Sequence, residues 1–136
     1  MAHTRNRDLP PAGQRPAIRI LAMPMDTNAT GDIFGGWLMS QVDIAGSIEA
    51  VRRVRGRIVT VAINEFRFIK PVYVGDLVSF YTRIHYIGTT SIRIHVDAFA
   101  ERNLAMEECH KIATAELTYV AIDADHKPVP IPPETP

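Results

Sequence analysis

The sequence predicts an α+β protein in which a curved antiparallel β-sheet wraps around one long central helix. Two observations lead to this fold class. A strongly apolar segment from about Gly35 to Val54 has the composition of a buried helix, and the chain after Gly56 is rich in β-forming residues. A helix that is apolar around most of its circumference cannot lie on a surface. Because one sheet cannot cover every side of it, we expect a second copy of the chain to pack against the helix.

Local signals define the elements up to the end of the helix. Residues 1 to about 16 are polar and contain proline, which predicts a mobile N-terminal arm. Residues 18–23 form a short strand candidate that ends at a proline. The loop 25–33 is rich in turn and cap residues, and the helix begins near Gly35. Gly56 is expected to end the helix, since glycine readily adopts the left-handed conformation.

Four β-rich segments follow the helix, and short connections between them imply antiparallel hairpins. They are Arg57–Lys70, Asp76–Ile87, Ser91–Glu101 and Cys109–Ile122. Apolar and polar residues alternate most clearly in residues 92–97. We therefore expect one domain over residues 17–124. The proline-rich tail, residues 125–136, is expected to be extended and poorly ordered.

Composition and charge exclude several classes of protein. The 136 residues suffice for one domain, and 15 Lys and Arg balance 15 Asp and Glu. A net charge of zero argues against a nucleic-acid or membrane partner. No apolar run approaches the ~20 residues that a membrane span needs. Cys109 is the only cysteine, so no internal disulfide can form, and a reducing, cytoplasmic location is expected. The five histidines are scattered, with no metal-ligand pattern.

Asp43 is the main candidate for chemistry. It lies about two turns into the predicted helix among apolar neighbours, where a desolvated carboxylate is costly. Its short side chain also competes for backbone groups, which makes Asp unfavourable inside a helix. One interpretation is a helix Asp that faces solvent. The apolar neighbours favour the other, in which Asp43 is a general base or nucleophile in a partly dry pocket.

The Gly35-Gly36 pair provides a second candidate feature. Glycines at a helix start leave backbone N–H groups accessible, and the helix dipole favours negative charge there, so the pair could form an oxyanion hole. Tight backbone packing is the alternative, and both can hold together. Gly35 and Asp43 are eight residues apart, about 12 Å along one helix. One helix cannot supply both groups to one carbonyl, so we predict an active site shared between two antiparallel helices.

Two further features each have alternative interpretations. Asn28 lies in the loop before the helix, where it could form an Asx turn or orient water or substrate. A cluster of arginines lies at the C-terminus of the predicted helix, at Arg52, Arg53, Arg55 and Arg57. It could interact with the negative end of the helix dipole or bind a phosphate of a nucleotide-bearing ligand. Nucleic acid is a third alternative, disfavoured by the balanced charge.

An ordered set of motifs resembles the bacterial YciA-type acyl-CoA thioesterases, which are hotdog-fold acyl-CoA hydrolases. It begins with Leu-Ala-Met-Pro at 21–24, Asp-Thr-Asn-Ala at 26–29 and Gly-Asp-Ile-Phe-Gly-Gly-Trp-Leu-Met-Ser-Gln at 31–41, followed by Asp43. It continues through residues 56–61, 68–71, 74–76, 88–91 and 119–121. The resemblance spans about residues 18–122.

The resemblance implies a hotdog fold and hydrolysis of acyl-CoA to free CoA and a carboxylic acid, with no metal or organic cofactor. It implies that Asp43 is the catalytic acid and that Gly35 donates its N–H to the thioester oxygen. Asn28 would work with the acid of the facing protomer. It also implies a homodimer of hotdogs, often assembled into a trimer of dimers, which is a hexamer. Further substrate-binding candidates are Gly36, Thr60, Val61, Phe68, Lys70, Gly88, Thr90, Ser91 and Arg93.

Two other functions are considered for the same fold. A hotdog dehydratase acting on hydroxyacyl thioesters would need a histidine paired with the acid, and no histidine lies near Asp43 in the sequence. A non-catalytic acyl-CoA-binding regulator would not need Asn28 and Asp43 together.

Overall fold

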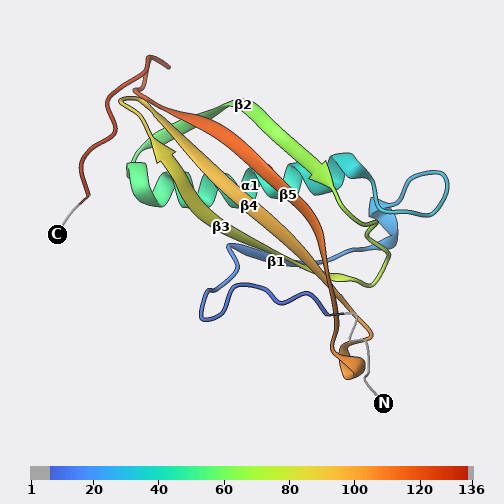
Figure 1. The fold of residues 1–136 in the computed structure, drawn as a ribbon. Coiled ribbons are helices and arrows are strands. Elements are labelled where there is room, and N and C mark those ends of the chain that lie inside the picture. Colours follow the sequence, from blue (N-terminus) through green and yellow to red (C-terminus); the bar gives the residue numbers. More distant parts are fainter. Residues whose placement is uncertain (1–6, 135–136) are drawn as a thin grey trace.

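A five-stranded antiparallel sheet curves around one long helix in the computed structural model, which describes residues 7–134 (Figure 1). The elements are β1 (Ile18–Leu21), a short 3₁₀ turn (Pro24–Asp26), α1 (Gly35–Val54), β2 (Arg57–Phe68), β3 (Leu77–Ile87), β4 (Ser91–Arg102), a second 3₁₀ turn (Leu104–Met106) and β5 (Glu108–Ile122). The strand order is β1-β3-β4-β5-β2. The predicted fold class is therefore confirmed.

Helix α1 runs from Gly35 to Val54, as predicted, and buries one side against the sheet. Its buried side chains include Leu38, Val42, Ala45, Ala50 and Val54. The opposite side exposes 46% of Ile44 and 45% of Val51. A single chain therefore leaves an apolar face of the helix uncovered, which agrees with the expectation that a second copy packs there.

The helix ends differently from the prediction. Arg55, not Gly56, adopts the left-handed conformation, with φ of 55°, and its N–H donates to the Val51 carbonyl at 2.7 Å. The helix ends at Val54, so the left-handed position falls one residue before the glycine. A non-glycine residue there costs roughly 1 kcal/mol. At the other end the helix cap is Phe34, which contributes no side-chain hydrogen bond.

The connection between β2 and β3 is a crossover, which corrects the prediction of consecutive hairpins. β2 pairs with β5 at one edge of the sheet, whereas β3 pairs with β1 and β4. Residues 69–76 join the two strands and pass the start of the helix, where the Ile33 N–H donates to the Val72 carbonyl (Figure 1). The sheet curls around α1, so this short loop can reach from β2 to β3.

Both terminal segments contact the sheet where the structure describes them, unlike the mobile arm and poorly ordered tail that we expected. In the first segment, the Asp8 N–H donates to the Cys109 carbonyl at 2.8 Å. In the tail, the Val129 N–H donates to the Ala121 carbonyl and the Ile131 N–H to the Thr89 carbonyl. The tail prolines lack N–H groups, but the residues between them supply donors and apolar side chains. Residues 1–6 and 135–136 lie outside the described residues.

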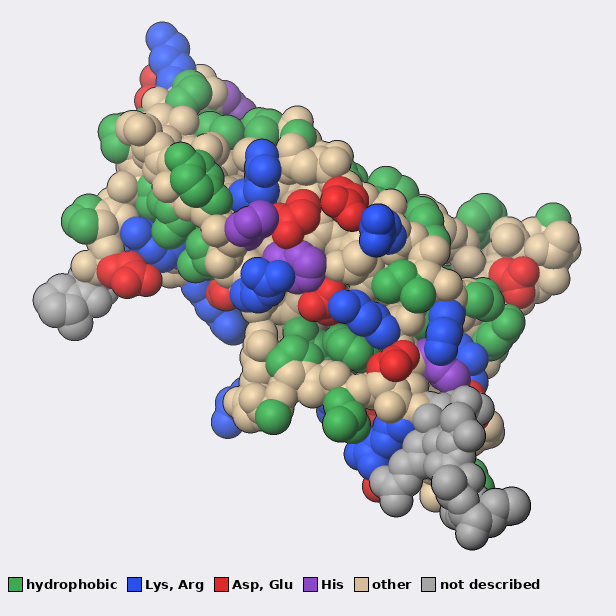
Figure 2. Space-filling view, viewed as in Figure 1, with side chains coloured by type: hydrophobic (Ala, Val, Ile, Leu, Met, Phe, Trp, Pro, Cys, Tyr) green, Lys and Arg blue, Asp and Glu red, His purple; other side chains and the backbone are tan. Residues whose placement is uncertain are grey.

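The outer face of the sheet carries a cluster of charged side chains near its centre (Figure 2). His95 contacts Asp97 through Nε2 at 2.9 Å and Glu116 through Nδ1 at 2.8 Å, and its protonated ring donates to both carboxylates. His85 contacts the other oxygen of Glu116 at 2.9 Å. The hydrogen bond to Asp97 raises the pKa of His95 against the opposing effect of burial. For Asp97, burial acts to raise the pKa, but hydrogen bonds from His95 and Thr114 outweigh it and lower the pKa to about 2.

This cluster predicts a stability maximum in mildly acidic solution. The raised pKa of His95 adds stability below about pH 6.5, which is lost as the pH rises through the raised value. The lowered pKa values of Asp97 and Glu116 add stability above about pH 4.5, which is lost on acidification. We expect the melting temperature to fall between pH 6 and pH 9, and to fall less in His95→Gln. Equal falls in both proteins, measured by thermal denaturation, would contradict this assignment.

Candidate active site

Asp43 lies at the centre of the site, where three elements meet. Its side chain projects from α1 toward β2 and β5 and is half-buried. The Thr60 hydroxyl on β2 donates to Oδ1 of Asp43 at 2.8 Å. The Tyr119 hydroxyl on β5 lies 3.2 Å from the same oxygen and 2.9 Å from the main-chain carbonyl of Asp43. These contacts distinguish Asp43 from a helix carboxylate that only faces water.

Tyr119 was not among the predicted site residues. It is fully buried, and it pairs with Thr60 across the β2–β5 ladder, which places both side chains on the helix side of the sheet. Burial and the nearby charge of Asp43 raise the pKa of Tyr119, so its phenol keeps its proton and acts as a donor. One sequence signal could have revealed it. Gly46 is a helix breaker in mid-helix, and it lies one turn beyond Asp43.

The start of α1 opens onto an apolar cavity of about 330 Å³. Its lining residues are Ile33, Phe34, Gly35, Leu38, Phe68, Ile69, Lys70, Pro71 and Val72. No side chain caps this helix start, and the first turn contains no acidic residue. The first N–H groups of a helix have no partner within it, so they remain suited to a negatively charged oxygen.

Gly35 and Gly36 differ in their surroundings. A β-carbon on Gly35 would lie 3.2 Å from the ring of Phe68, which is tighter than ordinary packing. A β-carbon on Gly36 would meet nothing within 4 Å. Close approach therefore favours glycine only at position 35, where the neighbour is an aromatic side chain of β2.

Asn28 forms an Asx turn in the loop before the helix. Its side-chain oxygen accepts hydrogen bonds from the Thr30 N–H at 3.0 Å, the Thr30 hydroxyl at 2.8 Å and the Asp32 N–H at 3.1 Å. The side-chain NH₂ donates to no residue between 7 and 134. The turn fixes the oxygen of the amide and leaves its nitrogen as a donor for a molecule outside the chain.

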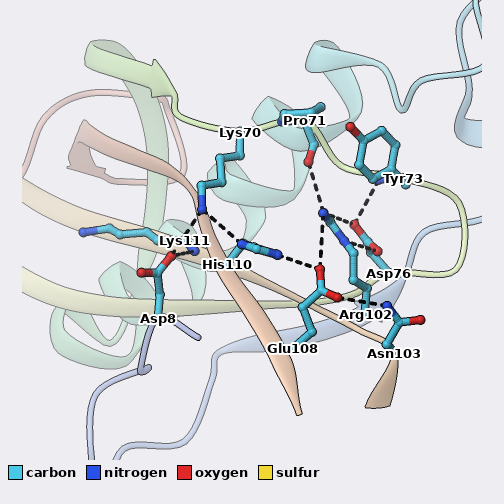
Figure 3. Close-up of polar contacts among 10 residues, drawn as sticks. All are labelled: Asp8, Lys70, Pro71, Tyr73, Asp76, Arg102, Asn103, Glu108, His110 and Lys111. Carbon is cyan, nitrogen blue, oxygen red and sulfur yellow. Dashed lines mark hydrogen bonds and ion pairs between the residues drawn. The ribbon is translucent and has the colours of Figure 1, made fainter. Parts of the chain in front are cut away.

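Lys70 at the edge of the cavity belongs to a chain of polar contacts (Figure 3). Its Nζ lies 3.0 Å from Nδ1 of His110 and 4.0 Å from a carboxylate oxygen of Asp8. An ammonium can only donate, so Nδ1 of His110 accepts, and its Nε2 donates to Glu108 at 2.7 Å. The lysine that lines the cavity is thus held by the first described segment and by β5.

A buried ion pair fixes the crossover loop, residues 69–76, to which Lys70 also belongs (Figure 3). Asp76 is 2% exposed and accepts two hydrogen bonds from Arg102, at 3.0 and 2.8 Å. It also accepts from the Tyr73 N–H at 2.9 Å, and Arg102 stacks over the Tyr73 ring at 4.7 Å. Arg102 donates to the Pro71 carbonyl as well. One carboxylate and one guanidinium therefore hold the loop that forms a wall of the cavity.

The remaining predicted residues lie at other places in the fold. Val61 is the extra residue of a β-bulge in β2 and is 54% exposed. Gly88, Thr90 and Ser91 form the β3–β4 turn, at the end of the molecule where α1 ends (Figure 1). Arg93 alternates with the buried Ile92 and Ile94, so it lies on the outer face of the sheet, away from Asp43.

At the end of the helix, a separate cavity of about 350 Å³ is lined by Arg52, Arg53, Arg55 and Glu134. Arg53 donates to the Pro132 carbonyl at 2.6 Å, and its Nε lies 3.8 Å from Glu134. The tail therefore supplies an intramolecular partner for one member of the cluster. No helix in the part of the chain that the structure describes is long and apolar enough to cross a membrane. Across residues 7–134, no three His, Cys, Asp or Glu side chains are arranged to hold a metal ion.

Comparisons with known proteins assign this chain and its fold to a class. The sequence profile described as "Thioesterase superfamily" matches residues 30–107, and the chain belongs to this superfamily. Within it, the chain is 49% identical over 118 residues to the acyl-CoA thioester hydrolase YciA of Salmonella typhimurium. That match covers 85% of this chain and 88% of the relative, which confirms the resemblance seen in the motifs.

Solved structures of acyl-CoA thioesterases and related thioesterases have the same fold as this chain. A hexameric thioesterase from Yersinia pestis superimposes with a TM-score of 0.84 at 44% identity, covering 91% of this chain and 99% of that one. A hexameric broad-specificity acyl-coenzyme A thioesterase, crystallised with one aspartate replaced by alanine, has a TM-score of 0.84 at 42% identity. This second match covers 88% of this chain and 87% of the other. The hotdog fold is confirmed.

Proposed function

We propose that the protein hydrolyses acyl-CoA thioesters to free CoA and a carboxylic acid. The observation that carries this proposal is the Asp43 carboxylate, held by two hydroxyl donors on a helix whose uncapped start opens onto an apolar cavity. Its similarity to the YciA hydrolase and to hexameric acyl-CoA thioesterases supports the same substrate class.

The active site is shared between two protomers in this proposal. Gly35 and Asp43 lie on one helix, about 12 Å apart, whereas both must lie within roughly 3 Å of the reacting group. The Gly35 N–H of one protomer would polarise the thioester carbonyl, and Asp43 of the other would act on it. The exposed Ile44, Val51 and Phe68 supply an apolar surface for the second protomer. The hexameric assemblies of the neighbours support a dimer of hotdogs built into a trimer of dimers.

The reaction can proceed by two routes. In one, Asp43 removes a proton from water, whose oxygen attacks the carbonyl carbon; the C–S bond breaks and the CoA sulfur takes a proton. In the other, a carboxylate oxygen of Asp43 attacks directly, forming a mixed anhydride that water then hydrolyses. The amide nitrogen of Asn28 would position the water. Both routes use protein groups and water, so the proposed reaction requires no metal or organic cofactor.

In this proposal, the predicted residues contact different parts of acyl-CoA. Gly36, Phe68 and Lys70 would contact the acyl or pantetheine part beside the cavity. Thr60 would act through Asp43. The remaining candidates on β2 and at the β3–β4 turn would line the rest of the route, and they are Val61, Gly88, Thr90 and Ser91. Arg93 lies on the outer face of the sheet and is left out of this proposed route. We propose a cytoplasmic enzyme with no nucleic-acid or membrane partner.

A panel of acyl-CoA substrates tests the proposed function. We expect the wild-type protein to release free thiol from short-, medium- or long-chain acyl-CoA, and the panel defines the preferred chain length. No release from any acyl-CoA by folded protein, with binding retained, would favour a non-catalytic regulator. Conversion of hydroxyacyl-CoA without thiol release would favour a dehydratase. Single turnover in ¹⁸O-labelled water tests the direct route, because label found in Asp43 would require an anhydride and would contradict direct water attack.

A further inference from the structure

We propose that Tyr119 and Thr60 are positioning residues that fix Oδ1 of Asp43 and leave Oδ2 as its reactive oxygen. This inference rests on the proposed thioester hydrolysis. Both hydroxyls converge on Oδ1, at 2.8 Å from Thr60 and 3.2 Å from Tyr119. No residue between 7 and 134 donates to Oδ2, so this oxygen is the one available to water or to a thioester carbon.

Tyr119 links the side chain of Asp43 to its own backbone. The single phenol proton is shared between Oδ1 and the main-chain carbonyl of the same residue, 2.9 Å away. The phenol is fully buried and keeps its proton, so it remains a donor at any working pH. A carboxylate can normally rotate and present either oxygen. Two fixed donors on one oxygen remove that freedom before substrate binds, which reduces the entropy lost on the way to the transition state.

Gly46 provides the space for this arrangement. A β-carbon at position 46 would overlap the Tyr119 hydroxyl and lie 3.1 Å from Cζ of the ring. Glycine in mid-helix costs roughly 1 kcal/mol relative to alanine, so the sequence retains an unfavourable residue at the point where the phenol approaches the helix. Gly46, Tyr119 and Asp43 therefore form one structural unit.

Matched substitutions at Thr60 test the inference directly. Thr60→Val keeps the shape of the side chain but removes the hydroxyl, whereas Thr60→Ser keeps the hydroxyl. We expect Thr60→Val to lower kcat by roughly 10- to 100-fold with KM nearly unchanged, and Thr60→Ser to restore most of kcat. Thr114→Val on the outer face of the sheet makes the same chemical change away from Asp43. It should leave kcat at the wild-type value.

Substitutions at Tyr119 and Gly46 provide an independent readout. Tyr119→Phe should lower kcat without raising KM. Tyr81→Phe makes the same chemical change at another buried tyrosine and should leave kcat unchanged. Gly46→Ala should lower kcat by displacing the phenol, and it should have a smaller further effect in the Tyr119→Phe background, where no hydroxyl remains to be displaced. In an Asp43→Asn background, none of these changes should lower the residual rate further. Circular dichroism and melting temperature identify any variant that fails to fold. If a Tyr119 or Gly46 variant fails to fold, the comparison of Thr60→Val with Thr60→Ser tests the positioning role.

The outcomes separate this inference from the proposed function. Equal kcat values for Thr60→Val and Thr60→Ser, or losses that appear only in KM, would overturn the positioning role while hydrolysis by the wild-type enzyme stands. Absence of hydrolysis by folded wild-type protein would overturn both.

Discussion

Replacing Asp43 with alanine is expected to lower kcat/KM for acyl-CoA hydrolysis by about 10³-fold, the usual contribution of a general base. The substitution removes the only carboxylate that Thr60 and Tyr119 hold beside the helix. The fold should persist, because the Tyr119 hydroxyl can still donate to the main-chain carbonyl at position 43. Thiol release from acyl-CoA, measured beside the melting temperature, tests both statements.

Two control variants sharpen this experiment. Asp43→Asn keeps the size of the side chain and an oxygen for the two donors, but it cannot accept a proton or attack as a carboxylate, so it should be nearly as inactive. Glu49→Ala removes a carboxylate from the same helix away from the site and should retain activity. A folded Asp43→Ala protein with the wild-type rate would assign Asp43 a structural role only.

Replacing Asp76 with alanine is expected to lower the free energy of unfolding by about 3–5 kcal/mol, the typical result of breaking a buried ion pair. The change leaves the Arg102 guanidinium without its two hydrogen bonds and leaves the Tyr73 N–H without an acceptor. Urea denaturation should show a lower midpoint with an unchanged slope. The crossover loop lines the cavity, so KM should also rise in the folded fraction.

The double variant Asp76→Ala/Arg102→Met tests the reason for this loss. Removing both charges eliminates the uncompensated guanidinium, so the double variant should be more stable than Asp76→Ala alone. Glu107→Ala disrupts an exposed ion pair, in which the side chain of Glu107 is 69% exposed and that of Arg7 is 34% exposed. This change should alter stability little. If Asp76→Ala unfolds at the same urea concentration as Glu107→Ala, the buried pair does not hold the loop.

Features determined by nearby residues could be predicted from the sequence. The bounds of α1 and the location of Asp43 on it follow from apolar spacing, and the strand segments match the observed strands to within two residues at each end. All of these depend on contacts within a few residues of chain.

Features determined by distant residues could not be predicted in the same way. The pairing of β2 with β5 depends on how the whole sheet curls, and nothing within β2 specifies its partner. Tyr119 meets Asp43 across 76 residues, so its role is visible only once the strands are placed. Arg55 took the left-handed position because the helix stopped at Val54, two residues before Gly56. The tail attached to the sheet because Val129 and Ile131 offered N–H groups between prolines.

The crossover between β2 and β3 affects the order in which the protein can fold. The β3–β4 and β4–β5 hairpins join neighbouring segments and can form locally, whereas β2 must wait for β5. Thr60 and Tyr119 are 59 residues apart in the sequence, so bringing them together carries the entropy cost of closing a long loop. We therefore expect the donors of Asp43 to converge late in folding. A chain that stopped short of this step would be compact and rich in secondary structure, yet it would lack the oriented carboxylate.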